Sequence, residues 1–183
     1  VIKLNRPEKR NALDPETVLM FNEFSEKAKD PKFRAVIVTG DESAFCGGAD
    51  ITAAASEDGM GWESVEQALN EGYHVGLNNL IYMDKVVIAA VEGACAGIGC
   101  AYYLSSDIAV MAKSSFFQIG FSKIALIPDG GSNWLLTKVV GYQQAFRMAA
   151  EAKRVSAEEC QSLGMCSEIC EDGSALDLSL IHI

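Results

Sequence analysis

The segment Val86–Ile108, VVIAAVEGACAGIGCAYYLSSDI, limits the possible fold more than any other part of this chain. It opens with six apolar residues that do not alternate with polar ones, which is typical of a strand buried on both faces of a sheet. A glutamate and three glycines then interrupt the apolar run, and residues 100–104 have the composition of a helix. The segment therefore predicts a strand, a glycine-rich turn and a helix. Free backbone N–H groups at such a turn attract negative charge, either a phosphate or a carbonyl oxygen that becomes an oxyanion.

Two other interpretations of this segment fit its residues less well. Residues 86–104 form a stretch of 19 with a single charge, which is long enough for a transmembrane helix. Glu92 lies inside that stretch, its glycines weaken a helix, and the sequence has neither a second span nor a basic flank. The glycines are spaced GxxxGxG with no Lys-Ser or Lys-Thr pair after them, so neither the P-loop nor the dinucleotide-binding fingerprint is met.

Composition narrows the classes of function. With 183 residues, 49% of them hydrophobic, the chain is expected to build one domain with a sizeable core. Its net charge of −10 disfavours binding to nucleic acid or to an anionic membrane. The six cysteines include no CxxC pair, which favours buried thiols in a reducing compartment. The two histidines, His74 and His182, lack ligand-spaced partners, so no metal centre is expected.

The two ends of the sequence indicate a fragment. Residues 1–25 are charged throughout and contain no secretion signal, and the chain starts without Met inside an expected strand. Residues 179–183 show no helical or turn closure. We therefore assign residues 1–170 to one domain and leave residues 171–183 as an unassigned tail. A cytoplasmic location is expected, with the mitochondrial or peroxisomal matrix as the alternative.

The order of the predicted elements indicates an α/β fold. An Asp-Pro pair caps a helix at residue 14, and a Ser-x-x-Glu capping box begins another at residue 156. Alternation of strands and helices predicts βαβ units on a mostly parallel sheet. Residues 52–61 are expected to form a mobile loop. Strands are expected at 1–4, 34–39, 86–91, 107–111 and 116–119, and helices at 14–29, 62–82, 98–106, 133–140, 142–152 and 156–164.

Four segments carry motifs that are recognisable together. They are LNRPEKRNALD at residues 4–14, FCGGADI at 45–51, GACAGIGCAYYLSSDI at 93–108 and LIPDGGSNWLL at 126–136. Their order and spacing resemble the enoyl-CoA hydratase/isomerase (crotonase) family over about residues 1–170. The resemblance implies a spiral core of ββα units, assembly as trimers or pairs of trimers, and action on acyl-CoA thioesters with no other cofactor. Family members usually continue with a C-terminal helical region, which this sequence lacks.

The resemblance also implies a site built on backbone donors. By motif, the N–H groups of Ala49 and Ile98 form an oxyanion hole for a thioester enolate, and one such donor is typically worth about 3 kcal/mol. The family more often has glycine at the position of Ile98, where a side chain keeps the donor but reshapes the pocket. Arg10 would meet a phosphate of CoA, although an exposed arginine also serves solubility alone. Substrate and CoA recognition is implied for Arg10, Ala12, Leu13, Asp50, Ile51 and Gly97.

The carboxylates expected at the site favour one reaction over another. Hydratases of the family use two glutamates to position and activate water, and by alignment these positions hold Ala101 and Phe121 here. Asp129 lies in IPDGG, where the family's enoyl-CoA isomerases carry their acid/base. A double-bond shift needs only one such group, so the sequence favours an isomerase. Aspartate before glycine is also a common turn residue, which is the structural alternative. Glu92 and Asp107 are expected to have structural roles.

Three classes of function therefore stay open. The first is an isomerase that moves the double bond of an enoyl-CoA, or the similar ring-opening isomerase of phenylacetyl-CoA breakdown. The second is another reaction of the family, such as hydration or thioester hydrolysis. The third is an acyl-CoA-binding or assembly module without catalysis. A homo-oligomer, either a trimer or a hexamer, is expected in each case.

Overall fold

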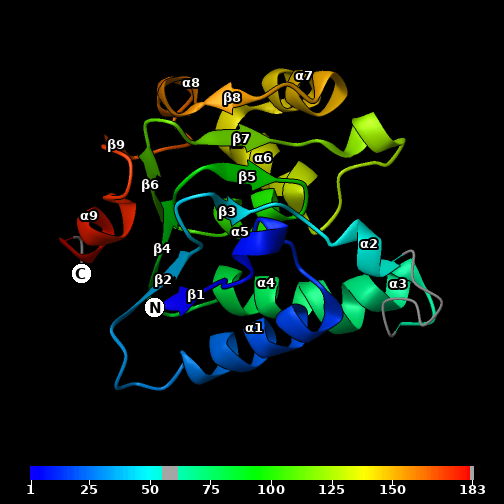
Figure 1. The fold of residues 1–183 in the computed structure, drawn as a ribbon, viewed down its shortest axis with the longest axis horizontal. Coiled ribbons are helices and arrows are strands. Elements are labelled where there is room, and N and C mark those ends of the chain that lie inside the picture. Colours follow the sequence, from blue (N-terminus) through cyan, green and yellow to red (C-terminus); the bar gives the residue numbers. More distant parts are fainter. Residues whose placement is uncertain (55–61, 182–183) are drawn as a thin grey trace.

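The larger of two sheets lies toward the left of the molecule in Figure 1, beside the smaller one. The computed structural model describes residues 1–54 and 62–181. The five strands of the larger sheet lie in the order β1-β2-β4-β6-β9, and all neighbouring pairs are parallel. This arrangement confirms the α/β class and the mostly parallel sheet. The strands are β1 (Ile2–Lys3), β2 (Ala35–Thr39), β4 (Val86–Val91), β6 (Ile108–Ala112) and β9 (Glu168–Cys170).

The smaller sheet is built from strands that follow those of the larger one. Its order is β3-β5-β7-β8, with only the β7–β8 pair antiparallel. Successive units β2-β3-α2, β4-β5-α5 and β6-β7-α6 each place one strand in each sheet before a helix. The sequence pattern misses three of these strands because runs of two or three residues show no periodicity. The strands are β3 (Ala44–Cys46), β5 (Ala94–Ala96), β7 (Phe116–Gln118) and β8 (Val155–Ser156).

The helices flank the sheets on opposite sides. Figure 1 shows α1 and α4 together along one side and α7 and α8 along the other. Asp14 caps α1 by accepting the N–H of Thr17 at 2.9 Å, and Ser156 and Glu159 form the expected capping box of α8. The helices are α1 (Pro15–Lys27), α2 (Ile51–Ala54), α3 (Val65–Gln67), α4 (His74–Ile81), α5 (Gly99–Leu104), α6 (Ser132–Val140), α7 (Tyr142–Glu151), α8 (Ala157–Ser162) and α9 (Ala175–Ile181).

The helix expected at residues 62–82 differs from a regular α-helix. It starts after the cap at Ser64, and a π-helix, Ala68–Tyr73, separates α3 from α4. Short 3₁₀ turns, which the sequence did not predict, occur at Pro7–Lys9 and Phe121–Ile124. Residues 52–54 are helical, and the remainder of the mobile loop expected at 52–61 lies outside the described residues.

Strand β4 is buried on both faces, as its unbroken apolar run predicts. Val87, Ala89 and Val91 pack into the main core, whereas Ile88 and Ala90 pack into a second cluster on the other face of the sheet. Five of the six cysteines are buried and all six are free thiols. Among the described residues, no helix combines the length and apolar character needed to cross a bilayer.

The prediction of an end without regular structure is wrong. Helix α9 covers Ala175–Ile181, and Ala175 packs into the second cluster. Its first turn is capped by Glu92, whose carboxylate accepts the N–H groups of Gly173 at 3.1 Å and Ala175 at 2.9 Å. The sequence does not reveal this helix because its cap lies more than 80 residues away. The structural roles expected for Glu92 and Asp107 are confirmed, since Asp107 accepts the N–H of Val87 at 2.8 Å.

Candidate active site

The turn between β5 and α5 presents a free backbone donor. Gly97 has φ = +54°, a conformation that glycine adopts without the strain of a side chain. Its own N–H donates to the carbonyl of Gln118 at 3.1 Å, which ties the turn to the end of β7. Within the described residues, the next N–H group, that of Ile98, has no hydrogen-bond acceptor. The turn therefore offers one unsatisfied donor, as the glycine-rich pattern predicts.

A second free donor lies in the turn after β3. Leu13 pairs with this turn by donating its N–H to the carbonyl of Gly48 at 2.8 Å and by accepting the N–H of Asp50 at 2.9 Å. The N–H of Ala49 lies between these two bonds and has no acceptor in the described part of the chain. Leu13 thus fixes the peptide group that carries the free N–H and the peptide group that follows it.

Close backbone packing brings the two turns together. Gly48 has φ = +103°, and a Cβ atom at this position would lie 3.1 Å from the carbonyl oxygen of Ala96 and 3.6 Å from the nitrogen of Ile98. Only glycine allows this approach without displacing the neighbouring backbone. As a result, the two residues that carry the free N–H groups, Ala49 and Ile98, line the same cavity.

This cavity has a volume of about 340 Å³ and mostly apolar walls. Asp129 is the only carboxylate among the described residues that line it. Small-molecule sites of proteins commonly combine such walls with a few converging polar groups. The apolar wall is formed by Ile51, Trp62, Val65, Leu69, Tyr73 and Leu126.

Asp129 is held at the cavity by the Pro-Asp-Gly-Gly turn. Its carbonyl accepts the N–H of Ser132 at 3.0 Å and the hydroxyl at 2.6 Å. The next residue, Gly130, has φ = +60° and packs so tightly that a Cβ atom there would lie 2.9 Å from Ile98 and 3.3 Å from Ala101. The turn therefore sets Asp129 beside the α5 donor turn.

The carboxyl group of Asp129 has unusual electrostatics. Its Oδ1 is buried and has no hydrogen-bond partner within the described residues. Burial raises the pKa of Asp129 from 3.8 to about 6. A carboxyl with this pKa is ionised at neutral pH yet accepts a proton readily, as a group that takes up and returns a proton requires.

The two positions that the family resemblance matches to the glutamates of hydratases carry no ionisable group. Ala101 is fully buried in α5, and Phe121 is 6% exposed at the start of a 3₁₀ turn. Neither residue lines the cavity. The carboxylate chemistry of the cavity therefore depends on Asp129 within the part of the chain that is described.

A family model described as enoyl-CoA hydratase/isomerase matches residues 1–179. The chain belongs to the enoyl-CoA hydratase/isomerase family. It is 36% identical over 172 residues to a Rhodobacter capsulatus protein named "Probable enoyl-CoA hydratase". It is 34% identical over 184 residues to the 1,2-epoxyphenylacetyl-CoA isomerase of Escherichia coli. These matches cover 94% and 96% of the chain but 65% and 68% of the two relatives, so the chain spans about two thirds of their length.

A solved structure supports the same assignment. The crystal structure of an enoyl-CoA hydratase from Polaromonas sp. JS666 matches 98% of this chain and 70% of that one, with a TM-score of 0.88 and 32% identity. The likeness confirms the crotonase-like arrangement of ββα units. The family includes proteins named for hydration and for isomerisation, so membership alone does not choose the reaction.

Of the residues that the family resemblance assigns to CoA binding, only Ile51 lines the described part of the cavity. Arg10 is exposed with φ = +52°, and Ile51 is 62% exposed at the cavity. The side chain of Leu13 is buried, and its N–H and carbonyl groups both bond to the turn after β3. Gly97 precedes the Ile98 donor directly, and Ala12 lies in the same loop as Arg10. Roles for these residues in CoA binding stay predictions.

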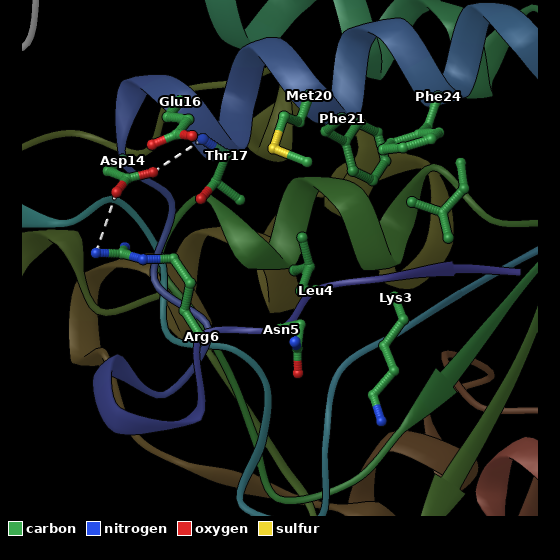
Figure 2. A pocket seen from close by; sticks show the side chains of 11 residues that line it. Lys3, Leu4, Asn5, Arg6, Asp14, Glu16, Thr17, Met20, Phe21 and Phe24 are labelled. Atoms are coloured by element: carbon green, nitrogen blue, oxygen red, sulfur yellow. Dashed lines mark hydrogen bonds and ion pairs between the residues drawn. The ribbon is translucent and has the colours of Figure 1, made fainter.

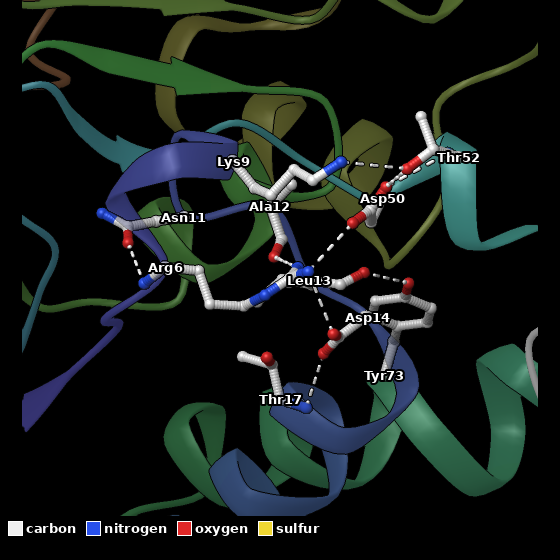
Figure 3. A network of polar contacts seen from close by, with 10 residues as sticks. All are labelled: Arg6, Lys9, Asn11, Ala12, Leu13, Asp14, Thr17, Asp50, Thr52 and Tyr73. Atoms are coloured by element: carbon white, nitrogen blue, oxygen red, sulfur yellow. Dashed lines mark hydrogen bonds and ion pairs between the residues drawn. The ribbon is translucent and has the colours of Figure 1, made fainter.

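The side chain of Asp50 has a structural role in this protein. Its Oδ2 pairs with the guanidinium of Arg6 at 3.1 Å, and its Oδ1 accepts the N–H of Thr52 at 3.1 Å and the hydroxyl at 2.5 Å (Figure 3). These bonds cap the start of α2. Any contact of Asp50 with CoA is therefore expected to come from its backbone.

Arg6 is an important residue that the sequence analysis missed. Its guanidinium contacts Asp14 and Asp50, each at 3.1 Å, and donates to the carbonyl of Ala12 at 2.6 Å (Figure 3). It therefore joins the loop of the first motif to the turn that carries the Ala49 donor. The sequence gives no signal for the pair with Asp50 because the partners are 44 positions apart.

Arg6→Met is expected to lower the free energy of unfolding by about 2 kcal/mol, because it removes the cation between two partly buried carboxylates. Urea unfolding at neutral pH measures the effect. Arg34→Met is the matched control, since Arg34 is exposed and its removal is expected to cost less than about 0.5 kcal/mol. Equal stability of the two variants would contradict the role of Arg6.

A second cavity is separate from this site. It has a volume of about 360 Å³ and lies between β1 and α1, with Met20 and Phe24 on one wall (Figure 2). Arg6 and Asp14 lie at one end of it. None of the residues predicted to bind substrate lines this cavity. We therefore assign the candidate active site to the cavity of about 340 Å³, which is lined by Asp129 and by Ala49 and Ile98, the two residues with a free backbone N–H.

Proposed function

We propose that this chain isomerises an enoyl-CoA thioester by shifting its carbon–carbon double bond through an enolate. One observation carries this proposal: Asp129, with a raised pKa, shares an apolar cavity with the unsatisfied N–H groups of Ala49 and Ile98. This set of groups matches the needs of proton transfer next to a thioester carbonyl.

The reaction uses the groups in a simple order. The thioester oxygen accepts hydrogen bonds from the N–H groups of Ala49 and Ile98, which stabilise the negative charge that develops there. Asp129 takes the proton from the carbon between the carbonyl and the double bond, and the electron pair moves into a dienolate. Asp129 then returns the proton to the far carbon of the original double bond. One carboxyl group is enough, because Asp129 both removes the proton from one carbon and delivers it to the other.

Hydration is the second candidate, and the name of the Rhodobacter capsulatus relative favours it. Adding water across a double bond calls for groups that hold and activate that water. Ala101 and Phe121 supply no such group, and the described walls of the cavity are mostly apolar. These features favour isomerisation over hydration.

A substrate comparison tests the proposal. The chain is incubated with a 3-enoyl-CoA, with the epoxide of phenylacetyl-CoA and with a 2-enoyl-CoA, and the products are separated by chromatography. Turnover of either of the first two, with slow hydration of the third, supports an isomerase. Efficient hydration would promote the second candidate. Binding of all three thioesters without turnover would indicate a non-catalytic module.

Assembly and location are separate proposals. We propose a homo-oligomer, a trimer or a hexamer, in the cytoplasm, as the family resemblance implies. Sedimentation of the purified chain tests the first point.

A further inference from the structure

A π-helix forms part of the wall of the candidate active site. The segment Ala68–Tyr73 has π-helical geometry, which is rare and frequently occurs at functional sites. The wider turn places Ala68 and Tyr73, five residues apart, at the same cavity. The carbonyl of Gly72 accepts the side-chain N–H of Asn22 at 3.0 Å, which anchors the π-helix to α1.

Glycine is required at one position of this π-helix. A Cβ atom at residue 72 would lie 2.7 Å from the ring of Trp62, which packs against this turn. The same ring lies 6.2 Å from that of Tyr73, measured between centroids. Packing on Trp62 and anchoring to Asn22 therefore fix where the Tyr73 side chain points.

The hydroxyl of Tyr73 reaches the loop that holds one of the donors. It donates to the carbonyl of Leu13 at 3.4 Å, and Figure 3 shows it approaching that loop. The same carbonyl accepts the N–H of Asp50 at 2.9 Å, while the N–H of Leu13 donates to Gly48 at 2.8 Å. Tyr73 is thus the second hydrogen-bond donor to the carbonyl of Leu13, and Leu13 in turn holds the peptide groups on the two sides of Ala49.

We infer that Tyr73 is a positioning residue that aims the Ala49 N–H at the thioester oxygen through the carbonyl of Leu13. The inference rests on the proposed function, since it assigns Ala49 to the oxyanion hole. The bond from Tyr73 is longer than a typical hydroxyl bond, so small movements of the ring change its strength. Because Tyr73 also lines the cavity, an acyl group bound there lies next to the residue that bonds the carbonyl of Leu13.

Tyr73→Phe tests this inference, because it keeps the ring and removes only the hydroxyl. Two other tyrosines in α5 are matched controls. The hydroxyl of Tyr102 is buried with no partner among the described residues, and that of Tyr103 donates to the carbonyl of Met165 at 2.6 Å. Tyr103→Phe therefore removes a buried hydrogen bond from a tyrosine hydroxyl to a backbone carbonyl, at a residue that does not line the cavity. Tyr102→Phe removes a hydroxyl that makes no hydrogen bond within the described residues.

The decisive measurement is the infrared stretching frequency of the thioester carbonyl of bound hexanoyl-CoA. The carbonyl carries an isotope label so that its band can be told apart from those of the protein, and each variant is measured with the ligand bound. Hydrogen bonds from the oxyanion hole lower this frequency, and no turnover is needed. For Tyr73→Phe we expect a smaller lowering than in the parent, a kcat reduced about five- to tenfold, and an affinity within about twofold. We expect both control variants to keep the parent frequency and kcat, although Tyr103→Phe lowers the melting temperature.

Two outcomes would overturn the inference while the proposed function stands. One is a parent-like carbonyl frequency in Tyr73→Phe. The other is a shift in the acid limb of its pH–rate profile near pH 6, which would mean that Tyr73 acts on Asp129 instead. If the parent itself showed no lowering of the frequency, the oxyanion hole and hence the proposed function would fail as well.

Discussion

Asp129→Asn is expected to lower the turnover of a 3-enoyl-CoA by about 10³-fold while leaving acyl-CoA affinity within a few-fold. Asparagine keeps the size of the side chain but does not take up a proton at neutral pH. Asp129 is the only carboxylate among the described residues of the cavity, so no neighbour there replaces it. Steady-state kinetics and calorimetric binding of a saturated acyl-CoA measure the two quantities.

The activity proposed for the parent protein is expected to depend on pH through the same carboxyl group. The Asp129 carboxyl must be ionised to take the first proton, and burial raises its pKa to about 6. The rate at low substrate concentration should therefore rise between pH 5 and 7 and then level off.

The same substitution is expected to stabilise the protein at neutral pH. Because the folded-state pKa of about 6 lies above the ordinary value of 3.8, the folded state binds more protons than the unfolded state between these two values. Stability of the parent therefore falls as pH rises through this window. Asp129→Asn avoids that loss and gains on the order of 2 kcal/mol above pH 6, with no gain below about pH 4.

Asp84→Asn is the control for these measurements, because Asp84 is exposed in the loop before β4. It is expected to alter neither turnover nor the pH dependence of stability. Near-normal turnover by a folded Asp129→Asn protein would remove Asp129 from the mechanism. If Asp129→Asn and the parent had the same free energy of unfolding at pH 7, burial of the ionised Asp129 carboxyl would not destabilise the parent.

Ala49→Pro is expected to lower turnover by about 10²-fold or more, because proline has no N–H to donate to the thioester oxygen. The pairing with Leu13 uses the carbonyl of Gly48 and the N–H of Asp50, so the substitution removes no observed hydrogen bond of the turn. The loss should therefore appear mainly in kcat. Steady-state kinetics with a 3-enoyl-CoA measure it.

Ala49→Gly is the matched variant, since it keeps the N–H and is expected to retain activity. Circular dichroism and CoA binding check that the proline variant is folded and that its loop still accepts the ligand. If a well-folded Ala49→Pro protein isomerised at close to the parent rate, the oxyanion hole would have to lie elsewhere.

The sequence alone determined the parts of this protein that depend on local pattern. The unbroken apolar run of Val86–Val91 indicated a strand buried on both faces, and the structure confirms it. Asp14 and Ser156 marked helix starts because capping is a contact between residues three positions apart. The motifs around Ala49, Ile98 and Asp129 identified the family.

Only the tertiary structure decided the features that depend on residues distant in sequence. The ion pair between Arg6 and Asp50 and the cap that Glu92 provides for α9 join positions 44 and more than 80 apart. The π-helix at Ala68–Tyr73 depends on packing against α1 and Trp62, since nothing in its own residues distinguishes it from an α-helix. The raised pKa of Asp129 arises from burial, which exists only once α5, the donor turns and the Pro-Asp-Gly-Gly turn have packed together.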